Sequence, residues 1–302
     1  MAAIRVLTHI SPTSLAAFSD CRQAWYWGYP GGLRPVKRQV ALELGDGVHQ
    51  ALAAYYKAQM DETAKAVDPV RFFTRWADRK IRELETDDAE DISVLAHIRT
   101  MGIAMLENYV AKYTNDQFEI LAVEREVTRV LPGTDWRIKV IIDAIIRDHG
   151  NYGKTWVLEH KTFSRFDESY LEKDHQFIAE AWCAKWLMQK IDPAHPEVEG
   201  TIWNGLRKQV PGPRVKNPLC ERRYLPINDA QIAMFHKRAR SMHAMLTQGR
   251  LAIYPEPSAI RCSYCSFKLP CTELQRGGDF QFLLDQGFTK RKDTEELEVE
   301  EA

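Results

Sequence analysis

The chain has 302 residues, of which 45% are hydrophobic and 27% are charged, a composition ordinary for a globular protein of one large or two modest domains. The formal net charge of −1 understates its basic character, because residues 293–302 hold six acids and no base and the remainder carries 41 basic and 36 acidic residues, a formal +5. With no signal-peptide core, no apolar run near the roughly 20 residues that span a bilayer and only six cysteines, we expect a cytoplasmic protein without membrane contact and with reduced thiols.

The N-terminal part is predicted to be helical. Ser11-Pro12 forms a helix start, a cap followed by proline in the first turn, and the helix expected over 13–27 carries Cys21. Further helices are expected over 41–58, 69–85 and 91–113, the last two in a helical insertion at about 60–115.

The pattern then changes to β-branched and aromatic strands, expected over 118–130, 136–146 and 154–162. Turn sequences at 132–133 and 151–153 separate them, as in an antiparallel meander. A helix over 168–190, strands near 198–226, a helix over 228–248 and a cysteine loop at 255–275 follow. Helices, strands and again helices predict an α/β fold of mixed α+β character.

A carboxylate interrupts the apolar strand Ile138 to Ile146, which would otherwise be wholly buried. This residue, Asp143, requires compensation. On the next strand Glu159 and Lys161 share a face, and an in-register hairpin would place Glu159 beside Asp143. A divalent cation would relieve the repulsion between the two carboxylates and activate water for attack on phosphorus, with Lys161 stabilising the phosphate. A cross-strand ion pair would explain the same short pattern.

Two more residues could complete such a site. His49 lies in Gly45-Asp-Gly-Val-His49 at a helix entry and could bind a cation together with Asp143, Glu159 and the backbone carbonyl of His160. Gln176, early in the helix after the strands, could hydrogen-bond a phosphate or Lys161.

Three cysteines, Cys262, Cys265 and Cys271, lie close together in the sequence near the C-terminus. A possible fourth partner, Cys21, lies 241 residues before Cys262. Thiolates are soft, anionic metal ligands. The spacing lets one loop supply three ligands, so the fourth must come from elsewhere. Such a set could hold an iron–sulfur cluster. Zinc is the alternative, although only one C-x2-C unit is present. Cys183 and Cys220 are the other possible fourth ligands.

Residues 203–224 hold six basic residues against one acid. They form either a solvated loop or a flexible basic hairpin that follows phosphates. In the second case the DNA contacts come from Arg207, Lys208, Arg214 and Lys216.

The ordered set of motifs resembles the PD-(D/E)XK nuclease superfamily, and within it the RecB-like branch with an iron–sulfur cluster. That branch includes the AddB nuclease domain, the CRISPR-associated RecB-like exonucleases and phage relatives. The resemblance covers about residues 10–272 and consists, in chain order, of Cys21, Gly45-x3-His49, Asp143, Glu159-x-Lys161, Gln176 and C-x2-C-x5-C. One position departs from the family pattern, since Glu180 stands where the family often has tyrosine.

The resemblance implies a restriction-endonuclease-like core, a central mixed sheet flanked by helices, with Mg²⁺ or Mn²⁺ at the His-Asp-Glu site. It also implies a mainly structural 4Fe–4S cluster that joins the two ends of the chain. We expect one nuclease domain over 1–285 and an acidic, disordered tail over 286–302.

The expected function is that of a stand-alone DNA exonuclease, since no GxxxxGK[ST] motor motif is present. It would act on DNA ends or single strands in phage recombination or CRISPR spacer acquisition, with protein partners of those processes, in a bacterium or a phage-infected host. The alternative is a non-catalytic iron–sulfur module that binds nucleic acid.

Overall fold

The computed structural model describes residues 9–37, 40–61, 63–84, 89–213, 215–248 and 251–291. The chain divides into two compact units. Unit 1 comprises Met1–Arg38, Val130–Lys139 and His236–Ala302, and unit 2 comprises Gln39–Arg129 and Val140–Phe235. Strand β4 (Arg137–Asp148) and helix α7 (Asp229–Thr247) each contribute residues to both units.

Unit 2 holds the longer helices and the main strands. Its helices are α3 (Val40–Gln59), α4 (Pro69–Arg82), α5 (Ala89–Tyr113) and α6 (His175–Ile191), with short 3-10 turns at His149–Asn151 and Leu171–Lys173. Its strands besides β4 are β3 (Phe118–Val130), β5 (Lys154–Phe163), β6 (Gly200–Arg207) and β7 (Cys220–Pro226).

The strands of unit 2 form a mixed sheet in the order β3-β4-β5-β6-β7. β4 and β5 are antiparallel, β5 and β6 are parallel, and β6 and β7 are antiparallel. A parallel pair needs a crossover connection, and α6 supplies it between β5 and β6. The mixed sheet with flanking helices agrees with the expected restriction-endonuclease-like fold.

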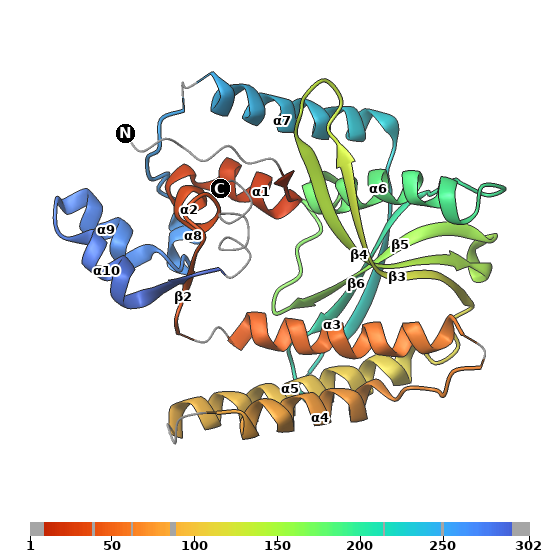
Figure 1. Ribbon diagram of the computed structural model, residues 1–302. Coiled ribbons are helices and arrows are strands. Elements are labelled where there is room, and N and C mark those ends of the chain that lie inside the picture. Colours follow the sequence, from red (N-terminus) through yellow and green to blue (C-terminus); the bar gives the residue numbers. More distant parts are fainter. Residues whose placement is uncertain are drawn as a thin grey trace. The chain divides into compact units, whose positions relative to one another are not determined.

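Helices cover both faces of this sheet. Figure 1 shows α3, α4 and α5 on one face and α6 on the other. The first group packs around a buried core that includes Phe73, Trp76 and Tyr109. Gly47 is required in this packing, because a Cβ atom there would lie 2.7 Å from the rings of Phe73 and Trp76. Gly47, two residues before His49, therefore allows α3 to approach α4 closely.

Unit 1 consists of short elements. They are β1 (His9–Ile10), α1 (Pro12–Asp20), α2 (Arg22–Gly28), β2 (Leu33–Pro35), α8 (Ala259–Ser263), α9 (Lys268–Arg276), α10 (Phe280–Gly287) and β8 (Phe288–Lys290). β1 pairs in parallel with the first residues of β4, and β2 pairs antiparallel with β8. A small core of Trp27, Phe267 and Leu284 holds α2 against α9 and α10.

Three boundaries differ from those predicted from the sequence. The helix expected over 13–27 is broken at Cys21, whose backbone is extended and separates α1 from α2. The helix expected from 168 begins at His175, because Asp174 caps it through the N–H of Gln176. Residues 288–290 form β8 within the predicted tail, so an ordered strand extends past residue 286; residues 292–302 lie outside the described residues.

Within the part of the chain that the structure describes, no helix combines the length and apolar character needed to cross a bilayer.

Candidate active site

The hairpin of β4 and β5 brings two carboxylates together, as the sequence predicted. Ala144 pairs with Leu158, so Asp143 and Glu159 follow at the end of the ladder. The N–H of His160 donates to Asp143 Oδ2 at 2.8 Å. Both carboxylates are almost fully buried, with Glu159 only 1% exposed. Charges buried this deeply must be compensated by neighbouring groups.

Lys161 and Gln176 provide part of this compensation to Glu159. The ammonium Nζ of Lys161 donates to Glu159 Oε1 at 2.6 Å and to Gln176 Oε1 at 2.9 Å, and Gln176 Nε2 donates to the same Glu159 oxygen at 2.7 Å. Gln176 reaches this position because α6 begins one residue before it. The structure therefore places the four predicted catalytic residues, Asp143, Glu159, Lys161 and Gln176, in one site.

His49 reaches the same site from α3. Its Nδ1 lies 3.3 Å from Asp143 Oδ2, and its ring meets the ring of His160 edge-on at a centroid distance of 6.0 Å. Burial opposes protonation, but Asp143 and Glu159 together raise the pKa of His49 above its usual value. A cation would be attracted to the same carboxylates, and the second ring nitrogen, Nε2, of a histidine held in this way is an ordinary metal ligand.

The two carboxylates have opposite protonation behaviour. Burial, followed by the charge of Asp143, raises the pKa of Glu159 to about 7. For Asp143 burial also favours the neutral form, yet His49 and the His160 N–H hold its pKa well below the usual range. Burial disfavours the Lys161 ammonium, but Glu159 and Glu180 hold the pKa of Lys161 above its usual value. The site thus combines a fixed anion, a fixed cation and a carboxyl group that titrates near neutrality.

The oxygen Glu159 Oε2 is buried and has no hydrogen-bond partner. Carboxylate oxygens are preferred ligands of Mg²⁺ and Mn²⁺, so an orphaned oxygen beside Asp143 and His49 fits a divalent cation. Among the described residues no three His, Cys, Asp or Glu side chains form a ready-made ligand set. The fit therefore rests on the donor chemistry around Glu159 Oε2.

Two further carboxyl groups lie near the site. Glu180, the position that departs from the family pattern, is 1% exposed. Burial and then the charge of Glu159 raise the pKa of Glu180 well above its usual value. Glu124 stands at a left-handed backbone angle in β3 (φ 49°), and burial followed by Asp143 raises its pKa. The sequence analysis did not single out Glu124; a left-handed residue inside a strand has no local sequence signature other than glycine or asparagine.

The basic stretch forms the β6–β7 hairpin, and its side chains differ in setting. Arg207 is 9% exposed; it donates to the carbonyls of Pro218 (2.9 Å) and Ser164 (3.1 Å). Lys208 is half-buried, which lowers its pKa, and Lys216 is exposed. Arg214 lies outside the described residues. Arg207 thus ties the hairpin to the loop after β5.

The four predicted cluster cysteines lie in unit 1 and line one cavity of about 270 Å³. Cys262 lies in α8, Cys265 in the turn after it and Cys271 in α9, while Cys21 stands at the break between α1 and α2. Burial raises the pKa of Cys265 and of Cys271, and the charges of the other cysteines in the set add to this rise. Among the described residues, however, no three of these sulfur atoms form a ready-made metal-ligand set.

Hydrogen-bond donors point at these sulfur atoms. The backbone N–H of Glu256 lies 3.4 Å from Cys21 Sγ, and that of Ser258 lies 3.4 Å from Cys262 Sγ. The amide of Gln275 is 3.6 Å from Cys271 Sγ. Hydrogen bonds to sulfur are among the features by which proteins tune bound iron–sulfur clusters. Cys183 and Cys220 are buried in unit 2.

A mixed sheet that presents adjacent carboxylates, a lysine and a helix glutamine defines the class of nucleases with a restriction-endonuclease-like core. The chain belongs to the PD-(D/E)XK nuclease superfamily, because the model of that family matches residues 9–272. As a member of this superfamily the chain is a metal-dependent phosphodiesterase in type, and the substrate class of the superfamily is nucleic acid.

No curated protein matches the chain. Among solved structures, the crystal structure of SSO0001 matches with 16% sequence identity and a TM-score of 0.31, over 76% of this chain and 93% of that chain.

Proposed function

We propose that this chain is a divalent-metal-dependent deoxyribonuclease that acts as an exonuclease on DNA ends or single-stranded DNA. The observation that carries the proposal is the buried, unpartnered oxygen of Glu159 in a site where Lys161 and Gln176 already occupy the other oxygen. A structural ion pair would use both oxygens, because leaving one buried and unpaired costs about 1–3 kcal/mol.

In this proposal His49, Asp143, Glu159 and the backbone carbonyl of His160 hold Mg²⁺ or Mn²⁺. When bound, the cation supplies Lewis acidity and an activated water. Lys161 remains protonated at neutral pH and stabilises the negative charge that grows on the phosphate. Gln176 holds the Lys161 ammonium in place through its Oε1.

We further propose that the β6–β7 hairpin contributes DNA affinity through Lys208 and Lys216, with Arg214 as a further contact. Arg207 was expected to contact DNA as well, and its donors already bind two backbone carbonyls. Neutralising Arg207 would therefore disturb the fold together with any phosphate contact.

The four cysteines are proposed to hold a 4Fe–4S cluster of structural role. Their common cavity and the N–H donors aimed at sulfur support this assignment, and a cluster needs four thiolates. Zinc is the competing occupant. Iron and acid-labile sulfide analysis of anaerobically purified protein separates the two, since a zinc protein contains neither.

The biological setting proposed from the RecB-like resemblance is phage recombination or CRISPR spacer acquisition, with protein partners from those processes. The family model spans residues of both units, which supports one functional nuclease domain over 1–285.

The test is digestion of end-labelled single- and double-stranded DNA with Mg²⁺ or Mn²⁺. We expect wild-type cleavage that chelation abolishes, and no cleavage by Glu159→Gln. Glu199→Gln is the matched control, because Glu199 forms a surface ion pair with Lys154. Wild-type protein that binds DNA without cleaving it would instead favour the non-catalytic module, and cleavage by Glu159→Gln at the wild-type rate would refute the site.

A further inference from the structure

A row of polar side chains crosses three strands next to the candidate active site. His160 on β5 pairs with Asn204 on β6, and Asn204 pairs with Arg222 on β7. Successive side chains on a strand alternate in direction, so the His160 ring lies on the opposite side of the sheet from Glu159 and Lys161. His160 and Asn204 are 2% and 0% exposed.

Only one assignment of hydrogen-bond donors and acceptors is possible in this row. Arginine can only donate, so Arg222 Nε, at 2.9 Å, fixes the oxygen of the Asn204 amide on its own side. The Asn204 Nδ2 group must then face His160 Nδ1, 2.6 Å away. Since an amide nitrogen donates, His160 Nδ1 must accept, and the ring proton must be on Nε2.

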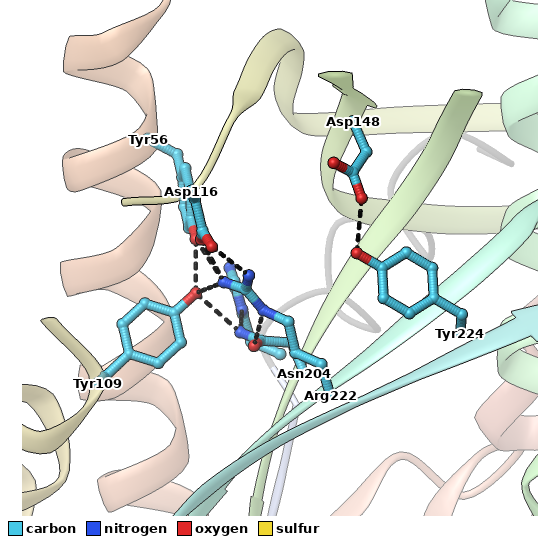
Figure 2. Close-up of polar contacts among 8 residues, drawn as sticks. Tyr56, Tyr109, Asp116, Asp148, Asn204, Arg222 and Tyr224 are labelled. Carbon is cyan, nitrogen blue, oxygen red and sulfur yellow. Dashed lines mark hydrogen bonds and ion pairs between the residues drawn. The ribbon is translucent and has the colours of Figure 1, made fainter. Parts of the chain in front are cut away.

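Arg222 is itself held rigidly. Its guanidinium pairs with Asp116 at 2.7 Å and donates to the hydroxyl of Tyr109 at 3.0 Å, and that hydroxyl contacts the hydroxyl of Tyr56 at 2.5 Å. Figure 2 shows these side chains converging on Arg222 and Asn204. The Tyr56 ring also stacks on the His160 ring at a centroid distance of 5.5 Å. The imidazole is therefore fixed by a hydrogen bond and by a stacking contact.

Stability alone does not require this arrangement. A buried charged network is often no more stabilising than apolar side chains of similar volume. The row ends at residue 160, which lies between Glu159 and Lys161 and whose N–H donates to Asp143. The side chains of the row are therefore placed where they can act on the strand segment that carries the candidate site.

We propose that Asn204 and Arg222 are positioning residues: they hold His160 in its Nε2–H tautomer and thereby fix the main chain at residue 160 for cation binding. The cation-binding part rests on the proposed function. Hydrogen-bond partners of metal-ligating side chains typically change metal affinity by 10–100-fold, and we expect an effect of this order here.

The first test is the tautomer, read from long-range ¹H–¹⁵N correlation spectra of the metal-free, full-length protein, with the His160 signals assigned through His160→Gln. We expect the proton on Nε2. Asn204→Asp keeps the size of the side chain and its pairing with Arg222 but cannot donate, so the proton should move to Nδ1. A wild-type proton on Nδ1, or an unchanged tautomer in Asn204→Asp, would overturn the proposal.

The second test is the affinity for Mn²⁺, measured by calorimetry on the folded protein. Asn204→Leu should weaken binding by at least about 10-fold, whereas Thr201→Val on the same strand should leave it unchanged. Thr201 is equally buried, and its hydroxyl donates to the Phe177 carbonyl. Wild-type affinity in folded Asn204→Leu would overturn the positioning role; if this variant does not fold, the tautomer in Asn204→Asp decides.

The failure of the proposed function gives a different result. In that case wild-type protein would not cleave DNA, and Glu159→Gln would bind Mn²⁺ as well as wild type does. If wild-type protein cleaves DNA and Glu159→Gln loses Mn²⁺ binding, while Asn204→Leu binds Mn²⁺ normally, only the positioning role is wrong.

Discussion

Glu159 is held in an environment that disfavours its charge. Its pKa is raised to about 7 by burial and by Asp143, against about 4.3 for an unperturbed glutamate. The protonated carboxyl stabilises the folded protein fully at pH values below the pKa of this group in the unfolded chain. This contribution is lost as the pH rises through the pKa of the group in the folded protein. The metal-free protein should therefore lose stability between about pH 4.5 and pH 7 because of this group.

Glu159→Gln should relieve this cost. We expect the free energy of unfolding of the metal-free variant to exceed that of wild type by about 1–3 kcal/mol at pH 8, and the difference to shrink toward pH 5. Urea denaturation at the two pH values measures it, with Glu199→Gln as control. A difference that is equal at both pH values would contradict the assigned cause.

The Lys161 ammonium is fixed by two acceptors, Glu159 Oε1 and Gln176 Oε1. Lys161→Ala should lower kcat on DNA by about 10²–10³-fold, the usual effect of removing one fixed transition-state donor. Single-turnover cleavage of labelled DNA measures this. Lys154→Ala at the start of the same strand is the control, and a wild-type rate in Lys161→Ala would remove the lysine from the mechanism.

At the scale of elements, the β6–β7 hairpin carries the proposed DNA contacts. Replacing Lys208 and Lys216 by glutamine should weaken DNA binding and reduce the slope of log K against log salt by about 1–2, because two phosphate contacts are lost. Fluorescence anisotropy over a salt series measures the slope. The control replaces the exposed Lys65 and Arg79 by glutamine. An unchanged slope in the hairpin variant would make the segment a solvated loop.

The strands were predictable because their apolar pattern and turn residues are local. Asp143 stood out as a charge within a buried strand, and the hairpin then placed Glu159 beside it. The row of His160, Asn204 and Arg222 was not predictable in the same way. It depends on the parallel pairing of β5 with β6 across the α6 crossover, and no local pattern encodes that register.

Arg222 likewise shows that the composition of a segment does not predict the role of each residue in it. In the sequence it is one of six bases in a stretch that suggests a solvated or DNA-binding surface, yet its guanidinium contacts two tyrosine hydroxyls, Asp116 and Asn204. The helix break at Cys21 was missed for another reason. The surrounding residues suit a continuous helix, and the extended backbone at Cys21 accompanies contacts with residues near 256 that are distant in sequence.

At the scale of the whole molecule, the two candidate sites lie in different units. The residues proposed for catalysis belong to unit 2, and the four cysteines belong to unit 1. Substitutions should therefore separate the two properties. Glu159→Gln should abolish cleavage and leave iron and sulfide content at the wild-type level, which elemental analysis of the same preparation measures. Loss of iron in Glu159→Gln would mean that the two sites are not independent.

Cys21 provides the sharpest test of the cluster, because it lies 241 residues from Cys262 in the sequence and lines the same cavity. Cys21→Ser should lose iron, sulfide and visible absorbance as completely as Cys262→Ser. Linking such distant positions restricts the unfolded chain, as a disulfide does by about 2–5 kcal/mol, so both variants should melt at a lower temperature. Cys183→Ser and Cys220→Ser should keep the cluster. Full iron and sulfide content in Cys21→Ser would show that another residue is the fourth ligand, and Cys183 and Cys220 would be tested next by the same measurement.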